Sequence, residues 1–153
     1  MHGCLAQLVE RRPYKANVGG SIPSAPTRFF FKDIKGVNEM PEIKSQHQCL
    51  NLDDLKKAES FGEPIGELPM QTDSGFLDRE DIFAGTWECE PGVLELDLDV
   101  TEFCHILKGH WVLTSESGQV TQVRAGDSFV FPKGWKGTAE VKETIRKVYM
   151  MLT

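Results

Sequence analysis

The stretch Gly126-Asp127-Ser128-Phe129-Val130-Phe131-Pro132-Lys133-Gly134 decides the fold. The glycine and aspartate at its start favour a turn, and the Phe-Val-Phe run that follows favours a β-strand. The proline and the last glycine favour a second tight turn. The stretch therefore predicts a short buried strand between two turns.

The rest of the C-terminal half repeats this pattern of short strands and turns. Leu94, Leu96 and Leu98 alternate with acidic residues, so this segment is expected to be a half-buried strand with its leucines inward. We expect further strands over residues 83–90, 102–107, 111–114, 120–124, 137–142 and 144–152. Such a series predicts an all-β antiparallel sandwich or barrel.

The segment from residue 40 to residue 82 is expected to be a lead-in to this fold. Residues 52–59 place acids early and lysines late, which is the charge order that a short helix favours. Residues 62–81 are rich in proline and glycine, and we expect a loop with one edge strand.

The first 39 residues differ from the remainder in charge and composition. They hold six basic and three acidic residues, a net charge of +3, whereas the rest carries −9. They are rich in turn formers and lack a sustained hydrophobic period, which predicts a disordered extension. A second hypothesis is that they are not native, because residues 7–27 resemble a translated transfer-RNA gene and residues 35–39 can encode a ribosome-binding purine run. Translation would then begin at Met40.

The overall composition limits the classes of function. With 153 residues, of which 40% are hydrophobic, the chain is long enough for one domain with a core. A formal charge of −6 argues against nucleic-acid binding, and no apolar run is long enough to cross a membrane. The four cysteines, Cys4, Cys49, Cys89 and Cys104, lack paired spacing and are expected to be reduced thiols. We predict a cytoplasmic protein.

Two motifs give the chain a resemblance to a known family. Glu102 is followed after six residues by Gly109, as at the end of the first cupin motif, and Gly126, Pro132 and Gly134 match the second. The chain resembles small cupins similar to ureidoglycine aminohydrolase and the ethanolamine-utilisation cupins, which residues 143–149 also resemble. The resemblance implies an antiparallel jelly-roll barrel of the RmlC-like cupin type over residues 83–153.

The same resemblance bears on metal binding, because cupins that bind a metal use histidines together with a carboxylate. The first cupin motif allows two distances between its pair of histidines and its glutamate. Counted back from Glu102, the histidine positions are occupied by Leu96 and Leu98 at one distance, or by Glu95 and Asp97 at the other. The position of the histidine in the second motif is occupied by Gly137. We therefore predict no metal cofactor.

An alternative is a metal site built from carboxylates alone. If a bulge reverses the strand, Glu95, Asp97 and Glu102 would form a carboxylate cluster suited to magnesium or manganese.

Glu102 is the centre of the predicted site. An inward Glu102 shares strand parity with Cys104, so the two are candidates for an acid–base group and a nucleophile, or they simply line a pocket. Lys147 is the expected ion-pair partner of Glu102. His105 has the opposite parity and should face away, whereas His110 could reach a barrel mouth. The predicted pocket residues are Trp87, Glu102, Cys104, Trp111, Lys147 and Tyr149.

Three classes of function follow from these expectations. The first is a cupin that binds a small polar metabolite without a histidine-bound metal, as a binding module or as an enzyme. The second is a metal-dependent enzyme similar to ureidoglycine aminohydrolase, and the third is a structural or partner-binding cupin. A homodimer through the outer sheet face is expected.

Overall fold

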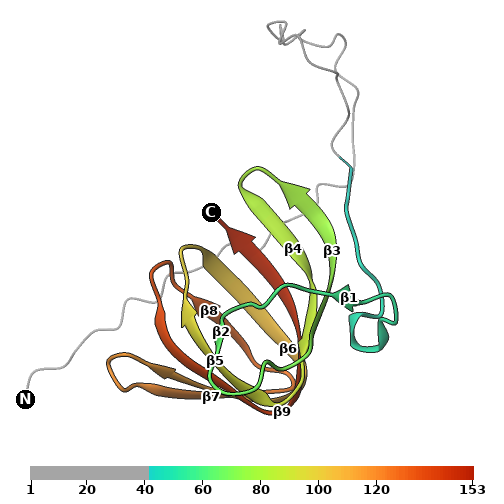
Figure 1. Cartoon of the computed structure of the whole chain (residues 1–153). Coiled ribbons are helices and arrows are strands. Elements are labelled where there is room, and N and C mark those ends of the chain that lie inside the picture. Colours follow the sequence, from blue (N-terminus) through green and yellow to red (C-terminus); the bar gives the residue numbers. More distant parts are fainter. Residues whose placement is uncertain (1–41) are drawn as a thin grey trace, which may run out of the picture. The chain divides into compact units, whose positions relative to one another are not determined.

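The computed structural model describes residues 42–153, which form one antiparallel sheet that curls around a common interior (Figure 1). Its elements are η1 (Cys49–Asn51), β1 (Lys56–Lys57), β2 (Glu63–Pro64), β3 (Gln71–Arg79), β4 (Ile82–Cys89), β5 (Gly92–Asp97), β6 (Thr101–Ser115), β7 (Val120–Arg124), β8 (Ser128–Phe131) and β9 (Lys136–Leu152). The all-β expectation is thus confirmed. The hypotheses about the extension and about Met40 lie outside the described residues.

The two longest strands, β6 and β9, pair with each other and form the centre of the sheet. The first half of β9 also pairs with β5, and its second half also pairs with β4, so the sheet continues to both sides. On the far edge of β6 lie β7 and β8. A strand long enough to join two halves of a sheet lets the sheet fold over a core.

The expected break within each of these two strands is a kink instead. The two strands expected over 102–107 and 111–114 form the single strand β6. Likewise, the two strands expected over 137–142 and 144–152 form the single strand β9. The register between them shifts around Gly109, which has a φ of 91°. A β-carbon there would lie 2.8 Å from the Glu143 carbonyl oxygen and closer still to that of Thr144. Glycine therefore allows the two strands to bend together.

The two turns around β8 form as their residues predict, but the expectation of a buried strand is wrong for most of β8. Only Phe131 is buried, whereas Val130 faces outward and is exposed. The Asp127 carboxylate accepts a hydrogen bond of 2.8 Å from the Arg124 backbone N–H, and Gly126 has a φ of 93°. After β8, the Trp135 N–H donates to the Pro132 carbonyl at 3.0 Å, and Gly134 has a φ of 84°. Both glycines adopt the left-handed region that favours glycine.

The core fills the interior of the curled sheet. Leu94, Leu96 and Leu98 are buried, as their alternation with exposed acids predicts. They pack with other buried side chains, namely Trp87, Cys89, Cys104, Ile106, Trp111, Leu113, Val123, Phe131, Ala139, Val141 and Ile145. Among residues 42–153, no helix has the length and hydrophobicity needed to span a membrane.

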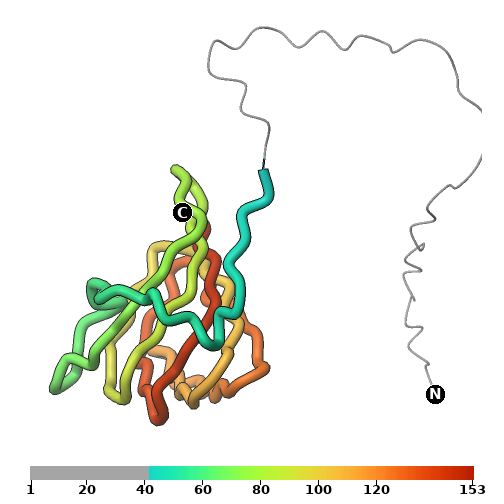
Figure 2. Tube along the Cα trace, turned by 90° about the vertical axis from the view of Figure 1, so that its right-hand side faces the viewer, coloured from blue at the N-terminus to red at the C-terminus, as the bar shows by residue number. Residues whose placement is uncertain are grey.

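The predicted helix over residues 52–59 is wrong. Within this range Lys56 and Lys57 form β1 and pair with β3, and the nearby helical turn is the short η1. Arg146 explains part of the difference, because its Nη1 atom donates to the carbonyls of Cys49, Leu50 and Leu52. The carbonyl of Leu52 is thus held by Arg146 and not by a helical N–H. Figure 2 shows this segment beside β9.

The expected loop over residues 62–81 contains two strands. The longer one, β3, runs for nine residues and pairs with β4, with a register shift between Gly75 and Leu77. The sheet therefore includes strands that precede Phe83. Glycine and proline mark turns well, but they do not prevent a strand when a neighbouring strand offers its hydrogen bonds.

Candidate functional site

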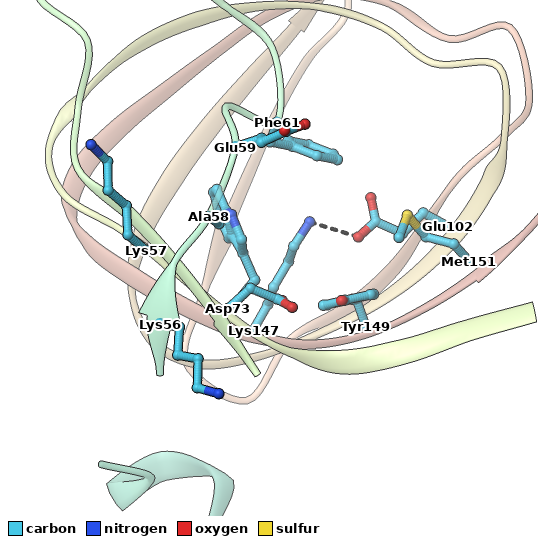
Figure 3. Close-up of a pocket in the computed structure, with 11 residues that line it drawn as sticks. Lys56, Lys57, Ala58, Glu59, Phe61, Asp73, Glu102, Lys147, Tyr149 and Met151 are labelled. Atoms are coloured by element: carbon cyan, nitrogen blue, oxygen red, sulfur yellow. Dashed lines mark hydrogen bonds and ion pairs between the residues drawn. The ribbon is translucent and has the colours of Figure 1, made fainter. Parts of the chain in front are cut away.

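One pocket of about 360 Å³ opens at the side of the barrel where β3, β4, β6 and β9 meet the segment that follows β1 (Figure 3). Its inner wall carries charged and aromatic side chains. The lining residues are Lys56, Lys57, Ala58, Glu59, Phe61, Asp73, Trp87, Glu102, Lys147, Tyr149 and Met151. The pocket volume lies at the small end of the range for ligand sites.

An ion pair forms the inner end of this pocket. The Nζ atom of Lys147 on β9 lies 2.6 Å from Oε1 of Glu102 on β6, and each side chain is only 1% exposed. Both point inward because they share strand parity with buried apolar neighbours, Cys104 and Ile145 respectively. The structure thus contains the ion pair that is expected between Glu102 and Lys147.

Aromatic rings surround the ammonium group of Lys147. Its Nζ atom lies 4.1 Å from the ring centroid of Phe61, 4.7 Å from that of Trp87 and 5.2 Å from that of Trp111. The Tyr149 ring is 5.9 Å away. The negative faces of such rings attract a cation, so they help to compensate the loss of water around the charge.

The charge of Lys147 is maintained despite its burial. Burial opposes the ammonium form, but the acidic groups around it, Cys104, Glu102 and Asp73, outweigh burial and raise the pKa of Lys147 above its ordinary value. Lys147 therefore serves as a fixed positive charge at neutral pH. It does not serve as a neutral amine nucleophile.

Two carboxyl oxygens in this pocket lack a hydrogen-bond partner among the described residues. They are Oε2 of Glu102 and Oδ1 of Asp73. Burial raises the pKa of Asp73, although the Tyr149 hydroxyl and the Lys147 ammonium act in the opposite direction. Burial also raises the pKa of Tyr149, and the Asp73 carboxylate adds to this effect. The pocket thus presents two acceptor atoms without a hydrogen-bond donor among residues 42–153.

The thiol of Cys104 lies behind this pocket and not in it. Its side chain is fully buried, and it is absent from the lining. Burial raises the pKa of Cys104 to about 12. The thiol is therefore protonated at neutral pH, which removes the basis for expecting a nucleophile there.

Four of the six residues expected in the pocket, Trp87, Glu102, Lys147 and Tyr149, line it. Trp111 contacts the Lys147 ammonium group but does not line the pocket; it is fully buried and, like Cys104, is part of the core. The sequence prediction missed Phe61, Asp73 and Met151, together with the rim residues 56–59. Met151 shares strand parity with Lys147 and Tyr149, so alternation could have indicated it.

The two histidines of β6, His105 and His110, lie on the outside of the sheet. Nδ1 of His105 is 2.8 Å from the Ser128 hydroxyl at an exposed position, and His105 faces away from Glu102 as predicted. Nε2 of His110 is 3.2 Å from the Gln122 side-chain oxygen, also at an exposed position. Neither histidine contributes to the pocket.

The carboxylate cluster proposed as an alternative metal site does not form. Glu95 and Asp97 are exposed on the outer face of β5, and Asp97 pairs with Lys136 at 2.5 Å, whereas Glu102 points inward. The strand keeps its leucine register, so the bulge that this alternative requires is absent from β5. Within residues 42–153, no group of three His, Cys, Asp or Glu side chains is placed to hold a metal ion.

The residues at the cupin ligand positions do not fit a metal ion either. Leu96 and Leu98 are buried in the core and offer no donor atom. A β-carbon at Gly137 would lie 2.8 Å from Cα of Ser115 and closer still to the Thr114 carbonyl oxygen, so a histidine has no space there. Glu102 already holds an ammonium group.

Comparisons with known proteins agree with this fold. Residues 78–149 match the family model described as the EutQ-like cupin domain. The EutQ protein of Clostridium difficile is 18% identical, with 63% of this chain and 79% of that protein covered and a TM-score of 0.53. A protein of unknown function from Pseudomonas syringae is 20% identical, with coverages of 65% and 45% and a TM-score of 0.60.

A cupin superfamily protein from Desulfitobacterium hafniense is 10% identical, with coverages of 73% and 93% and a TM-score of 0.52. No curated protein matches the sequence. These likenesses establish that the fold is that of a cupin. Within that fold, residues 78–149 are similar to the EutQ-like cupin domain.

Proposed function

We propose that this chain binds a small polar metabolite in the pocket beside Glu102, without a histidine-bound metal. The observation that carries the proposal is the Lys147–Glu102 ion pair at the inner end of an open, aromatic-walled pocket. A buried ion pair contributes little net stability compared with apolar residues of similar volume. Charged groups retained in a cleft are a typical feature of functional sites.

The pocket has the parts that a small ligand needs. Phe61, Trp87 and Met151 supply apolar surface, whereas Asp73 and Glu102 supply fixed polar groups that would orient the ligand. Such a mixture of apolar walls and a few convergent polar groups is typical of small-molecule sites.

A thermal-shift screen of polar metabolites tests this proposal. A true ligand present at 100 times its dissociation constant stabilises the protein by about 2.7 kcal/mol. We expect Glu102→Gln to abolish that stabilisation, and Tyr149→Phe serves as a second pocket variant if Glu102→Gln does not fold. Asp97→Asn removes an exposed carboxylate on the outer face and is the matched control. A ligand whose stabilisation survives both pocket variants would overturn the site.

The metal-dependent alternative, an enzyme similar to ureidoglycine aminohydrolase, makes a different prediction. It requires one bound metal ion per chain, whereas the side chains at the ligand positions, Leu96, Leu98 and Gly137, provide no donors. Metal analysis of the purified full chain separates the two functions. One stoichiometric divalent ion per chain would contradict our proposal.

A separate observation favours a homodimer. Phe103, Val130 and Met150 are exposed and lie in one row, because Phe103 is the cross-strand partner of both others. We propose that this row packs against the same row of a second copy, since apolar patches on an outer sheet face mark interaction sites. Sedimentation should show a dimer that Phe103→Ser dissociates. Val120→Ser, at an exposed position in β7, should leave the dimer intact, and a monomeric wild-type chain contradicts the proposal.

A further inference from the structure

The inner part of the pocket contains more acidic than basic side chains. Asp73 and Glu102 supply two carboxyl groups, and Lys147 supplies the ammonium group (Figure 3). Lys56 and Lys57 belong to the rim, where both are exposed and extend away from the Lys147–Glu102 pair in Figure 3. If both carboxyl groups are ionised, the described inner wall therefore has an excess of one negative charge.

The unpaired carboxyl oxygens of the pocket also favour a ligand that donates hydrogen bonds. Glu102 is 1% exposed, and its Oε1 atom accepts from Lys147 while Oε2 has no partner among residues 42–153. Oδ1 of Asp73 is likewise buried without a donor. A buried acceptor without a donor is unfavourable, so a ligand that brings N–H groups gains what the protein alone does not satisfy.

The pocket walls also favour a cation. The rings of Phe61, Trp87 and Tyr149 already surround one ammonium group at 4.1 to 5.9 Å. The positive charge of Lys147 is compensated by Glu102 at 2.6 Å, which leaves Asp73 as the carboxyl group without an ion-pair partner within 4.0 Å in the described part of the chain. Aromatic faces and a carboxylate together are the usual surroundings of a bound organic cation.

We propose that the ligand of this pocket carries a single positive charge on an N–H donor group, such as a primary ammonium or amidinium, attached to a small apolar part. Its N–H groups donate to Oδ1 of Asp73 and Oε2 of Glu102, and its apolar part contacts Phe61 and Met151. This inference rests on the proposed function, because it assigns a chemical class to the metabolite that the pocket binds.

Three probes of similar size and different charge test the inference: propylammonium, propionamide and propionate. Each is titrated into the full-length, isotopically labelled chain at pH 7 and constant ionic strength, to about 50 mM because so small a molecule binds weakly. The readout is the NMR signal of the Trp87 indole, which lines the pocket. We expect propylammonium to give a saturable shift, with an affinity at least about tenfold above the other two.

Substitution of Asp73 provides the second arm. Asp73→Asn should weaken propylammonium about tenfold, because a hydrogen bond to a charged group is lost together with the charge. The same substitution should leave the neutral propionamide unchanged. Asp97→Asn, on the outer face, is the matched control and should change neither affinity. If Asp73→Asn does not fold, Asp73→Ser replaces it.

The outcomes separate the inference from the proposed function. Preferential binding of propionate or propionamide overturns the positive charge but keeps a small-molecule site. Propylammonium binding that Asp73→Asn leaves intact also overturns the inference, because the cation then binds elsewhere. If none of the three probes shifts the Trp87 signal, both the inference and the proposed pocket are contradicted.

Discussion

At the scale of single residues, Lys147 and Glu102 occupy the most costly positions in the molecule. Both are charged, both are 1% exposed, and they come from strands whose other inward residues are mostly apolar. Two charges removed from water need each other, and the aromatic rings around Nζ compensate only part of the cost.

A double-mutant cycle should measure this dependence. Lys147→Met or Glu102→Leu alone should lower the free energy of unfolding by about 3–5 kcal/mol, because each leaves one buried charge without its partner. Lys147→Met combined with Glu102→Leu should recover most of that loss. Urea unfolding at pH 7 gives the values. Losses that simply add in the double variant would show that the two side chains are not coupled.

At the scale of elements, the paired strands β6 and β9 depend on one glycine. Gly109 and Gly118 have similar φ values, 91° and 84°, but only Gly109 lies against backbone atoms of another strand. Gly118→Ala should cost about 1–2 kcal/mol, the penalty of the left-handed conformation alone. Gly109→Ala should cost clearly more, because the Glu143–Ile145 backbone must also move. Equal losses in urea unfolding would mean that the kink does not need glycine.

A second element-scale device is the attachment of the η1 segment to the barrel by Arg146. The guanidinium donates to three carbonyls of the segment, and its Nε donates to Glu88 at 2.7 Å. Although burial acts in the opposite direction, Lys108 and Arg146 together lower the pKa of Glu88. This contribution to stability is present above pH 4.5 and is lost as the pH falls through the lowered folded-state pKa.

Arg146→Lys should therefore release the segment, because a lysine offers no planar set of donors. We expect faster hydrogen exchange over residues 49–58, with little change in β4 and β8. Lys108→Gln removes the more exposed partner of the same Glu88 and is the control, for which exchange should stay close to wild type. If hydrogen exchange over residues 49–58 is unchanged in Arg146→Lys, the attachment of the η1 segment by Arg146 is contradicted.

At the scale of the whole molecule, the buried ionisable groups make the fold sensitive to base. Burial raises the pKa of both Cys89 and Cys104 from 9.0 to about 12, and the pKa values of Tyr149 and Lys147 are also raised. A group whose pKa is raised on folding contributes stability that is complete below its unfolded pKa and is lost as the pH rises through the folded value.

The free energy of unfolding should therefore begin to fall near pH 9, where the unfolded thiols ionise first, and should keep falling towards pH 12. The Cys89→Ala/Cys104→Ala variant should have a lower free energy of unfolding than wild type at pH 7. That free energy should stay constant to about pH 10, where the tyrosine and lysine side chains begin to lose their protons in the unfolded state. Urea unfolding between pH 7 and pH 11 measures both curves. If the free energy of unfolding of the wild type stays constant to pH 10, the expected effect of burial on the pKa values of Cys89 and Cys104 is contradicted.

Strand parity was sufficient to predict much of the site. The alternation of Leu94, Leu96 and Leu98 predicted their burial. An inward Glu102 called for a partner, and the structure forms the expected pair with Lys147. Alternation works because successive side chains of a strand point to opposite faces, whatever the rest of the chain does. The order of charges in residues 52–59 failed as a helix signal because pairing with β3 outweighed it.

What the sequence by itself determined was the all-β cupin fold, through its turn residues and its hydrophobic alternation, together with the lack of donors at the cupin metal positions. Only the tertiary structure decided which side chains meet around Lys147. Phe61 and Asp73 reach the pocket from segments far from β9 in the sequence. Local patterns determine which way a side chain points, whereas the curling of the sheet determines what it meets.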